Sequence, residues 1–379
     1  MPYWRLGSFY FFYFGSLGAL MPYWGLYLQD RGFSSLAIGQ LVAILLGTKI
    51  IAPNLWGWLA DHLGQRMPIV RLASLLAMVS FVGIFAVDGF VQMALVMVLF
   101  SFFWNASLPQ MEAVTFSHLG ERVNRYAGIR LWGSVGFILV VGGLGIALQA
   151  LGTAVVPWVV IGLYAGVWLS ALAVPEGPRP SREWASPALM GLLRRREIQA
   201  FLASGLFMQL SHGAYYAFYS IYLEEAGYGS LTIGSLWAWS VIVEVLVFLG
   251  MHRLLGAFGA RRVLLVSFAL AVVRWLLIGS FVEDLAIQVF AQALHAATFG
   301  AFHAAAIHLA YHYFPGRTQG RGQALYNSAS FGIGGSAGAL LSGYLWTAAD
   351  PLATFGVSAA AAAIGWVLVW RWVDFERRF

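Results

Sequence analysis

Five ionisable residues stand inside long apolar stretches of this chain, away from its other charges: Lys49, Glu112, Arg130, Glu244 and Arg274. An ionised group in hydrocarbon costs at least about 2.5 kcal/mol, so such residues are functional candidates that face an aqueous cavity. Three bases and two acids leave a formal surplus of one positive charge, which suits a bound monovalent carboxylate. Protonation of either acid would raise this surplus and so couple a proton to an anionic ligand.

The stretch that contains Glu112 also carries a polar stripe. Ser101, Asn105 and Glu112 are separated by four and seven residues, which places them on one face of a helix. Asn105 is therefore a candidate ligand residue, although an interhelical hydrogen bond explains it equally well. Glu112 fits both ligand binding and proton transfer.

Two further stretches combine histidine with aromatic residues at helical spacing. His212 precedes Tyr216 by four residues, and Phe299 lies midway between His295 and His303. Histidine titrates near neutrality and can pass protons, so we expect His295 to take part in proton coupling. The other histidines and Tyr216 are candidate ligand contacts, unless each histidine is a neutral core residue bonded to a carbonyl. No metal site is expected, because no carboxylate accompanies His295 and His303, which lie about 12 Å apart along a helix.

Aromatic residues are dense in the same stretches and suit a flat, partly apolar ligand, because rings offer stacking and edge contacts. Packing against lipid or a neighbouring helix also explains each of them. The candidates are Tyr23, Trp24, Trp104, Trp132, Tyr215, Tyr216, Trp237, Trp239 and Tyr326.

The composition indicates an integral membrane protein. The chain is 60% hydrophobic and 10% charged, whereas soluble domains carry about 25% charged residues. Its mean hydropathy is +0.76, and it has no cysteine. Charges, glycines and prolines divide it into twelve stretches, each long enough to cross a bilayer as a helix of about 20 residues. We predict spans at 4–28, 36–60, 68–87, 91–118, 127–149, 154–173, 198–223, 231–253, 262–281, 285–313, 322–347 and 352–371.

The predicted fold is all-α, with two pseudo-symmetric six-helix bundles at 1–174 and 198–379. A Pro- and Arg-rich segment, 175–197, is the expected cytoplasmic linker. Most of the 22 basic residues fall in segments that are cytoplasmic if both termini are inside, which is the positive-inside pattern. The net charge of +6 therefore reports topology and does not indicate a nucleic-acid partner.

The two halves repeat each other in sequence. Residues 27–53 align without a gap with residues 222–248, and Gly64 falls opposite Gly259. Internal duplication is how many secondary transporters are built, with binding where the halves meet. In this register Lys49 lies opposite Glu244, so we expect the two charges to interact directly or through ligand and water. Snorkelling of Lys49 to the membrane surface is the alternative.

The segment "GWLADHLGQR" (57–66) resembles the cytoplasmic-loop signature of the major facilitator superfamily, Gly-x-x-x-Asp-x-x-Gly-x-Arg. The resemblance implies twelve helices and alternating access. It also implies that Gly57, Asp61, Gly64 and Arg66 form a conformational switch that does not touch the ligand. The glycine-rich spans 127–149 and 322–347 are repeat mates, which suggests paired use in rocking.

"QMEAVTFSHLGERVNRYAGIRLWGSVGF" (110–137) is similar to the lactose permease-like and phenylpropionate permease-like branch of that superfamily. The resemblance implies that Glu112 and Arg130 bind substrate and that Glu244 joins substrate to proton. It also implies that Arg274 and a histidine of span ten have counterparts in members of that branch. Acids found in span seven of sugar members are missing here, and the N-terminal span looks more like the phenylpropionate-type members. The expected substrate is thus an aromatic or other organic acid.

These observations predict a proton-coupled symporter that imports a small organic solute, with Glu244 as the first candidate for the proton carrier and Glu112 as the second. We expect a multi-pass monomer in a bacterial inner membrane, with both termini cytoplasmic, with small-molecule substrate, proton and lipid as partners, and without a cofactor. Three alternatives remain: a sugar or nucleoside symporter, a drug/proton exporter, and a non-transporting receptor on the same fold. An enzyme is not expected, because no nucleophile–base set or phosphate loop occurs.

Overall fold

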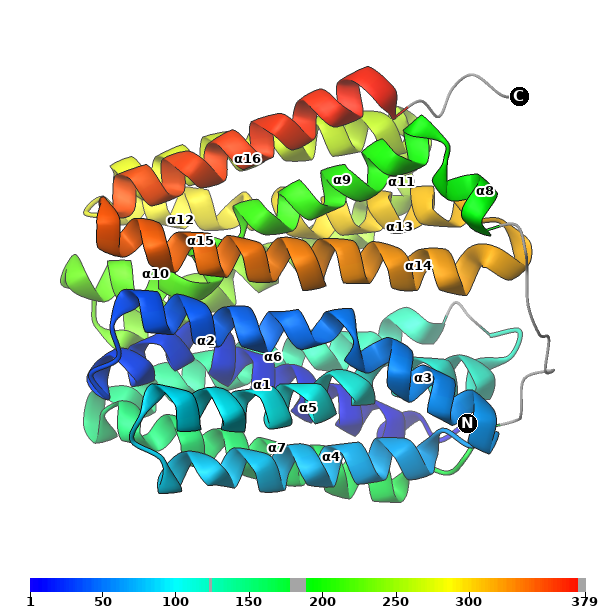
Figure 1. Cartoon of the computed structure of the whole chain (residues 1–379), viewed down its shortest axis with the longest axis horizontal. Helices are drawn as coiled ribbons and strands as arrows, with labels where there is room; N and C mark the ends of the chain where they lie inside the picture. The colour runs from blue at the N-terminus through cyan, green and yellow to red at the C-terminus, as the bar shows by residue number, and fades with distance from the viewer. Residues whose placement is uncertain (123–124, 178–188, 374–379) are drawn as a thin grey trace. The chain divides into compact units, whose positions relative to one another are not determined.

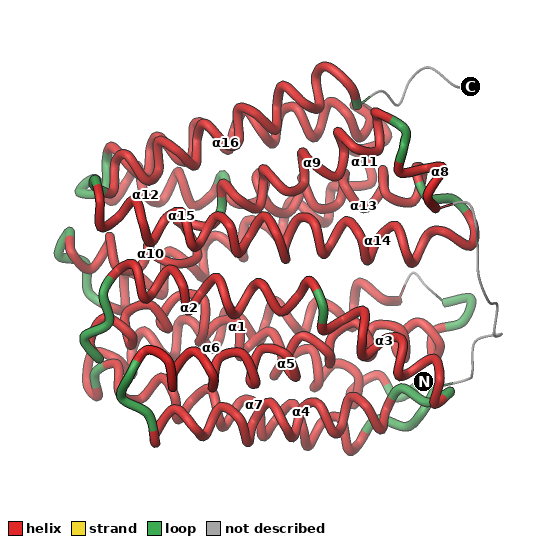
Figure 2. The backbone as a smooth tube through the Cα atoms, viewed as in Figure 1, coloured by secondary structure: helices red, strands yellow, loops and turns green. Residues whose placement is uncertain are grey.

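Helices account for nearly all of the chain. The computed structural model describes residues 1–122, 125–177 and 189–373, and within these ranges there is no β-strand (Figure 2). Helices satisfy every backbone N–H and C=O inside one segment, which a membrane-spanning chain needs because hydrocarbon offers no hydrogen bonds.

The first half of the chain contains helices that match the first six predicted spans (Figure 1). The second span is broken near its middle by the 3-10 segment η1, and the third and sixth carry short 3-10 turns at one end. The elements are α1 (Tyr3–Asp30), α2 (Ser35–Gly47), η1 (Thr48–Ile50), α3 (Ala52–Leu63), α4 (Met67–Val82), η2 (Gly83–Ala86), α5 (Phe90–Leu119), α6 (Tyr126–Leu151), η4 (Thr153–Val155) and α7 (Val156–Ala173).

The second half is more interrupted than the first. Its seventh span is broken at His212, and its tenth and eleventh spans contain the π-helical segments η5 and η7. The elements are α8 (Leu189–Leu193), α9 (Arg196–Ser211), α10 (Gly213–Glu225), α11 (Ser230–Ser280), α12 (Leu285–Ala293), η5 (Ala296–Ala301), α13 (Phe302–Tyr313), η6 (Gly316–Thr318), α14 (Gln319–Asn327), η7 (Ser328–Gly334), α15 (Gly335–Ala348) and α16 (Pro351–Trp372).

The predicted twelve-span plan agrees with these elements. Within the described residues, eight helices are long and apolar enough to cross a membrane. One of them, α11, contains both the eighth and ninth predicted spans, because two helices meet at the non-helical Gly259. The less apolar α1, the α9–α10 pair and the α14–α15 pair supply the other three. Gly259 and its repeat mate Gly64 both have positive φ, 74° and 65°, so the repeat extends to the backbone.

The exposed surface of the helices is apolar, as expected of residues that face lipid. Val91, Leu139, Ile146 and Leu249 are each at least 60% exposed. A soluble domain rarely leaves so many large apolar side chains in water. The helices therefore lie in a bilayer.

Contacts divide the chain into two compact units. Unit 1 comprises Met1–Glu183 and Tyr228–Ala238, and unit 2 comprises Trp184–Gly227 and Trp239–Phe379. The predicted boundaries at 174 and 198 stay predictions, since residues 178–188 of the expected linker lie outside the described residues.

Within each unit, glycines allow helices to cross at backbone contact. A Cβ on Gly136 of α6 would lie 2.1 Å from the carbonyl oxygen of Phe11 in α1, and one on Gly18 would lie 2.7 Å from that of Phe137. In unit 2, a Cβ on Gly213 would lie 2.1 Å from the carbonyl carbon of Gly338. Since Gly18 and Gly213 are repeat mates, the crossing of α1 with α6 recurs between α10 and α15.

Replacing Gly136 with alanine should separate α1 from α6, because the main chain of Phe11 cannot move aside as a flexible side chain could. We expect a loss of about 1–3 kcal/mol in the free energy of unfolding, typical of overpacking. Thermal unfolding of the purified protein in detergent measures the change. Gly143→Ala is the matched control, since a Cβ at Gly143 of the same helix meets nothing within 4 Å. Equal melting temperatures for the two variants would contradict the close crossing.

Candidate functional site

Lys49 lies at a break in the second span. The helix α2 ends at Gly47 and α3 begins at Ala52, with Lys49 in the 3-10 turn between them. Pro53 has no N–H to donate to the carbonyl of Lys49, so the α-helix cannot continue through this point. The Lys49 ammonium lies 5.8 Å from the centroid of the Trp104 ring, a distance at which the cation and the indole face attract each other.

Asn105 supports the break that presents Lys49. Its Nδ2 donates to the carbonyl of Leu45 at 3.3 Å and to Oγ1 of Thr48 at 2.8 Å. Both amide hydrogens are thereby used to tie α5 to the end of α2, where Oγ1 of Thr48 also donates to the carbonyl of Leu45 at 3.4 Å. The structure thus gives Asn105, predicted as a ligand contact, a structural partner in α2.

Glu112, Tyr126 and Arg130 form the second polar group of unit 1. The Tyr126 hydroxyl donates to Oε1 of Glu112 at 3.1 Å. Glu112 and Arg130 act on each other electrostatically, yet they form no direct ion pair in the described part of the chain. These three residues come from α5 and α6, as the predicted pairing of Glu112 with Arg130 requires.

The Arg130 guanidinium is held by rings and leaves its N–H groups available. Its Cζ lies 3.5 Å from the centroid of Phe14 and 6.0 Å from that of Tyr10. No hydrogen bond joins it to any residue that the structure describes. A guanidinium offers five donors in a rigid fork that matches a carboxylate, so Arg130 is positioned to bind one.

The four predicted switch residues lie at the join between α3 and α4. Nη2 of Arg66 lies 2.7 Å from Oδ1 of Asp61, and its Nη1 donates to Oε1 of Gln110. Gly64 ends α3 in the left-handed conformation with φ of 65°. A Cβ on Gly57 would lie 3.5 Å from Nε2 of Gln110, so the signature segment packs on α5.

Glu176, for which no role was predicted, joins this cluster. Its carboxylate accepts from the backbone N–H of Arg66 at 3.1 Å and of Met67 at 2.9 Å, at the start of α4. Arg71 of α4 in turn donates to the carbonyls of Ala171 and Val174 at the end of α7. An acid at a helix N-terminus and an arginine at a C-terminus both complement the helix dipole. An acid directly after span six was the available signal.

Arg274 is the buried cation of unit 2. It is fully inaccessible, and the rings of Tyr215 and Trp275 lie 4.3 and 4.6 Å from its Cζ. Its nitrogen atoms donate to Ala291 O, Gln292 Oε1, Thr298 Oγ1 and His295 Nδ1, all at 3.0–3.1 Å. Arg274 was predicted to contact the ligand, but its hydrogen bonds are directed to neutral groups of the protein.

His295 connects Arg274 to Glu244. Because arginine can only donate, Nδ1 of His295 must accept, and in the neutral ring Nε2 then carries the hydrogen. This Nε2 lies 3.2 Å from Oε2 of Glu244, whose side chain is 15% exposed. In this tautomer, the His295 ring forms a hydrogen-bonded bridge between the buried Arg274 guanidinium and the Glu244 carboxylate.

The π-helical segment η5 keeps the histidine stripe on one face. The rings of His295 and Phe299 stack at 5.2 Å, and those of Phe299 and His303 at 6.2 Å. In a straight α-helix, residues eight apart diverge by roughly 80° around the axis. The wider turn of η5 reduces this divergence, so the three rings stack in succession.

His212 caps its own broken helix. Its backbone N–H turns to Gln209 O, and its Nδ1 donates to the carbonyl of Met208 at 2.8 Å instead. Nε2 is buried without a hydrogen-bond partner in the described part of the chain. The ring of Tyr216 lies 5.7 Å away. Nδ1 thus has a structural role, while Nε2 is an acceptor that no described residue uses.

Lys49 belongs to unit 1 and Glu244 to unit 2. Their predicted interaction therefore stays a prediction. Among the residues described, no group of three His, Cys, Asp or Glu side chains could hold a metal ion.

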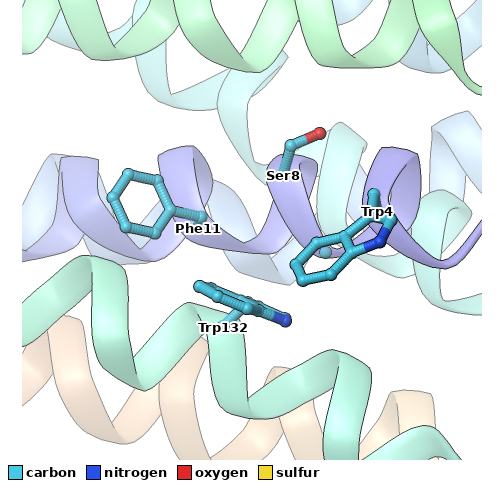
Figure 3. A pocket seen from close by; sticks show the side chains of 5 residues that line it. Trp4, Ser8, Phe11 and Trp132 are labelled. Carbon is cyan, nitrogen blue, oxygen red and sulfur yellow. The ribbon is translucent and has the colours of Figure 1, made fainter.

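An aromatic cavity of about 180 Å³ lies between α1 and α6 (Figure 3). It is lined by Trp4, Gly7, Ser8, Phe11 and Trp132. Arg130 contacts Tyr10 and Phe14 of the same helix α1. None of these three residues lines the cavity, so the cavity and the cationic group are separate features of this helix pair.

Comparisons with known proteins agree with the resemblance seen in the sequence. A family model described as the MFS_1 like family matches residues 3–357. A probable 3-phenylpropionic acid transporter of Escherichia coli (strain K12) is 30% identical over 317 residues, 79% of each chain. The maltose permease of Geobacillus stearothermophilus is 28% identical over 352 residues, 89% of this chain and 86% of the permease. The crystal structure of nucleoside transporter NupG has a TM-score of 0.85 at 16% identity and covers 99% of this chain and 100% of its own, a likeness of fold.

Replacing Asn105 with leucine should lower the melting temperature of the ligand-free protein, because Leu45 O and Oγ1 of Thr48 each lose a hydrogen bond from the amide. One hydrogen bond contributes about 0.5–1.5 kcal/mol to stability. Thermal unfolding without ligand measures this effect. An unchanged melting temperature combined with weaker ligand binding would instead assign Asn105 to the ligand.

Proposed function

Because the chain belongs to the MFS_1 like family, within the major facilitator superfamily of transporters, we propose that it is a proton-coupled symporter that imports a small organic acid. Its matched relatives are a transporter and a permease, so it is a transporter and not an enzyme. We place it in a bacterial inner membrane as a monomer with both termini cytoplasmic.

The observation that carries this proposal is the environment of the Arg130 guanidinium in unit 1. Arg130 has no hydrogen-bonded partner among the described residues, and its guanidinium lies over the Phe14 ring. Lys49 is half-buried beside Trp104. The five N–H donors of Arg130 are therefore available to the carboxylate of a substrate.

The aromatic side chains around these cations favour an aromatic acid. Tyr13 and Phe100 both stack on Trp104, at 5.9 and 5.8 Å. A substrate with an aryl group gains from such surroundings, since rings interact with rings by stacking and edge contacts. The relative named for 3-phenylpropionic acid supports the same substrate class.

A sugar substrate is the second candidate. Glu112 and Arg130 together offer an acceptor and a donor group, which suits hydroxyl groups, and a maltose permease is among the relatives. The rigid fork of the Arg130 guanidinium matches a carboxylate better than it matches single hydroxyl groups, so we favour the acid.

Glu244 is the proposed proton carrier of unit 2. Its carboxylate accepts from His295, which in turn accepts from Arg274. Binding of a proton by Glu244 removes its negative charge, and the Arg274 charge is then unbalanced within this group. Binding of one proton thus changes the electrostatic energy of this group of residues in unit 2. Glu112 is the second candidate for this role.

The cluster at the join of α3 and α4 would bias the transport cycle. Asp61 and Arg66 are paired at 2.7 Å, and Glu176 fixes the start of α4. We propose that this set stabilises one conformation of the cycle and releases another when its hydrogen bonds break.

Glu244→Gln should abolish uptake driven by a pH gradient but preserve exchange of substrate across the membrane, because glutamine mimics the protonated carboxyl and carries no proton. Uptake and exchange of radiolabelled 3-phenylpropionate in proteoliposomes measure both activities. Uphill uptake at the wild-type rate would exclude Glu244 as the carrier.

Arg130→Lys should raise the KM for a carboxylate about tenfold or more, because lysine cannot form the bidentate fork. Competition of uptake by arylpropionates, maltose and nucleosides measures the substrate class in the same vesicles. Competition by maltose alone would replace the acid with the sugar.

A further inference from the structure

The π-helical segment η5 brings two residues to the same side of the tenth span. A π-helix has i→i+5 hydrogen bonds, so His295 and Gly300, five residues apart, lie above one another. In an α-helix the same spacing would separate them by roughly 140° around the axis. Such π-segments are rare and occur frequently at functional sites.

Both residues contact the same side chain. His295 lies 3.2 Å from the Glu244 carboxylate. A Cβ built on Gly300 would lie 2.8 Å from Cγ and 3.6 Å from Cδ of Glu244, and 3.5 Å from Cε2 of Phe248. The bare backbone of Gly300 is therefore the surface on which the Glu244 methylene group rests.

Charged and titratable groups from neighbouring elements act on Glu244, and the structure shows three of them. His295 holds its carboxylate, Arg274 acts through His295, and Tyr216 of α10 interacts with it electrostatically. A displacement of the carboxyl group by one ångström would change its distance to all three.

We propose that Gly300 is a positioning residue for Glu244: the missing side chain at the π-turn lets the Glu244 carboxyl group reach His295. This inference rests on the proposed role of Glu244 as proton carrier. A methyl group at residue 300 would displace the flexible glutamate side chain and leave the helix in place. The substitution would therefore change the proton affinity of Glu244 and leave the fold unchanged.

Infrared titration of the purified protein without substrate tests the proposal. The carboxyl band that Glu244→Gln removes reports protonation of Glu244 in each variant. Gly300→Ala should move the midpoint of this band by about one pH unit or more, which is a tenfold change in proton affinity. Gly250→Ala, on the same helix as Glu244, should leave it unchanged, because a Cβ there meets nothing within 4 Å.

The outcomes separate this inference from the proposed function. An unchanged midpoint in Gly300→Ala would overturn the role of Gly300 while leaving Glu244 as the carrier. Absence of any band that depends on Glu244 would overturn both.

A double-mutant cycle keeps the test valid if Gly300→Ala is unstable. Glu244→Ala removes the Cγ atom that the new methyl group would meet, so the loss of melting temperature caused by Gly300→Ala should diminish in that background. An equal loss in both backgrounds would show that Gly300 acts on something other than Glu244.

Discussion

Every polar group at membrane depth must find its partner inside this protein, because the surrounding hydrocarbon supplies none. Arg274 illustrates the constraint most completely, since four neutral acceptors and two aromatic rings surround it. The same constraint acts where helices break. Asn105 binds the end of α2, and His212 binds the carbonyl released at the end of α9. Arg130 differs, since its guanidinium lies over the Phe14 ring and forms no hydrogen bond with any residue that the structure describes.

The two halves share a backbone plan but use it for different chemistry. Gly18 and Gly213 occupy equivalent places in close helix crossings, and Gly64 and Gly259 share positive φ. The π-segments, however, occur in the second half among the residues described. Unit 1 keeps its span-four helix regular through Pro109 and presents cations. In unit 2 the equivalent helix, span ten, contains the π-helical segment η5. It carries His295, which contacts the carboxylate of Glu244 on α11.

Much of the fold could be predicted because apolar stretches, interrupted by charges and glycines, report spans directly. The sites were harder to predict. Glu112 and Arg130 share a polar group as expected, because their spacing across a short loop restricts them. Asn105, His212 and Arg274 form hydrogen bonds within the protein, and their predicted contact with the ligand stays a prediction. A polar residue that hydrogen-bonds to a neighbouring helix has the same sequence signature as one that faces a cavity, so periodicity could not separate the two roles. Neither π-segment has a residue signature. Glu176 lies directly after span six, and its position at the edge of the expected linker did not suggest a structural role.

The widened turn at Ala296–Ala301 also affects how this chain compares with others. A π-turn holds one residue more than the α-turn it replaces. Alignment with a relative whose tenth helix is regular therefore needs a single-residue gap within this segment. If the gap is omitted, every later position on the helix is matched to a residue that points about 100° away. Identity between the two chains in the part of the helix that follows Gly300 would then be undercounted, and His303 would be compared with the wrong residue.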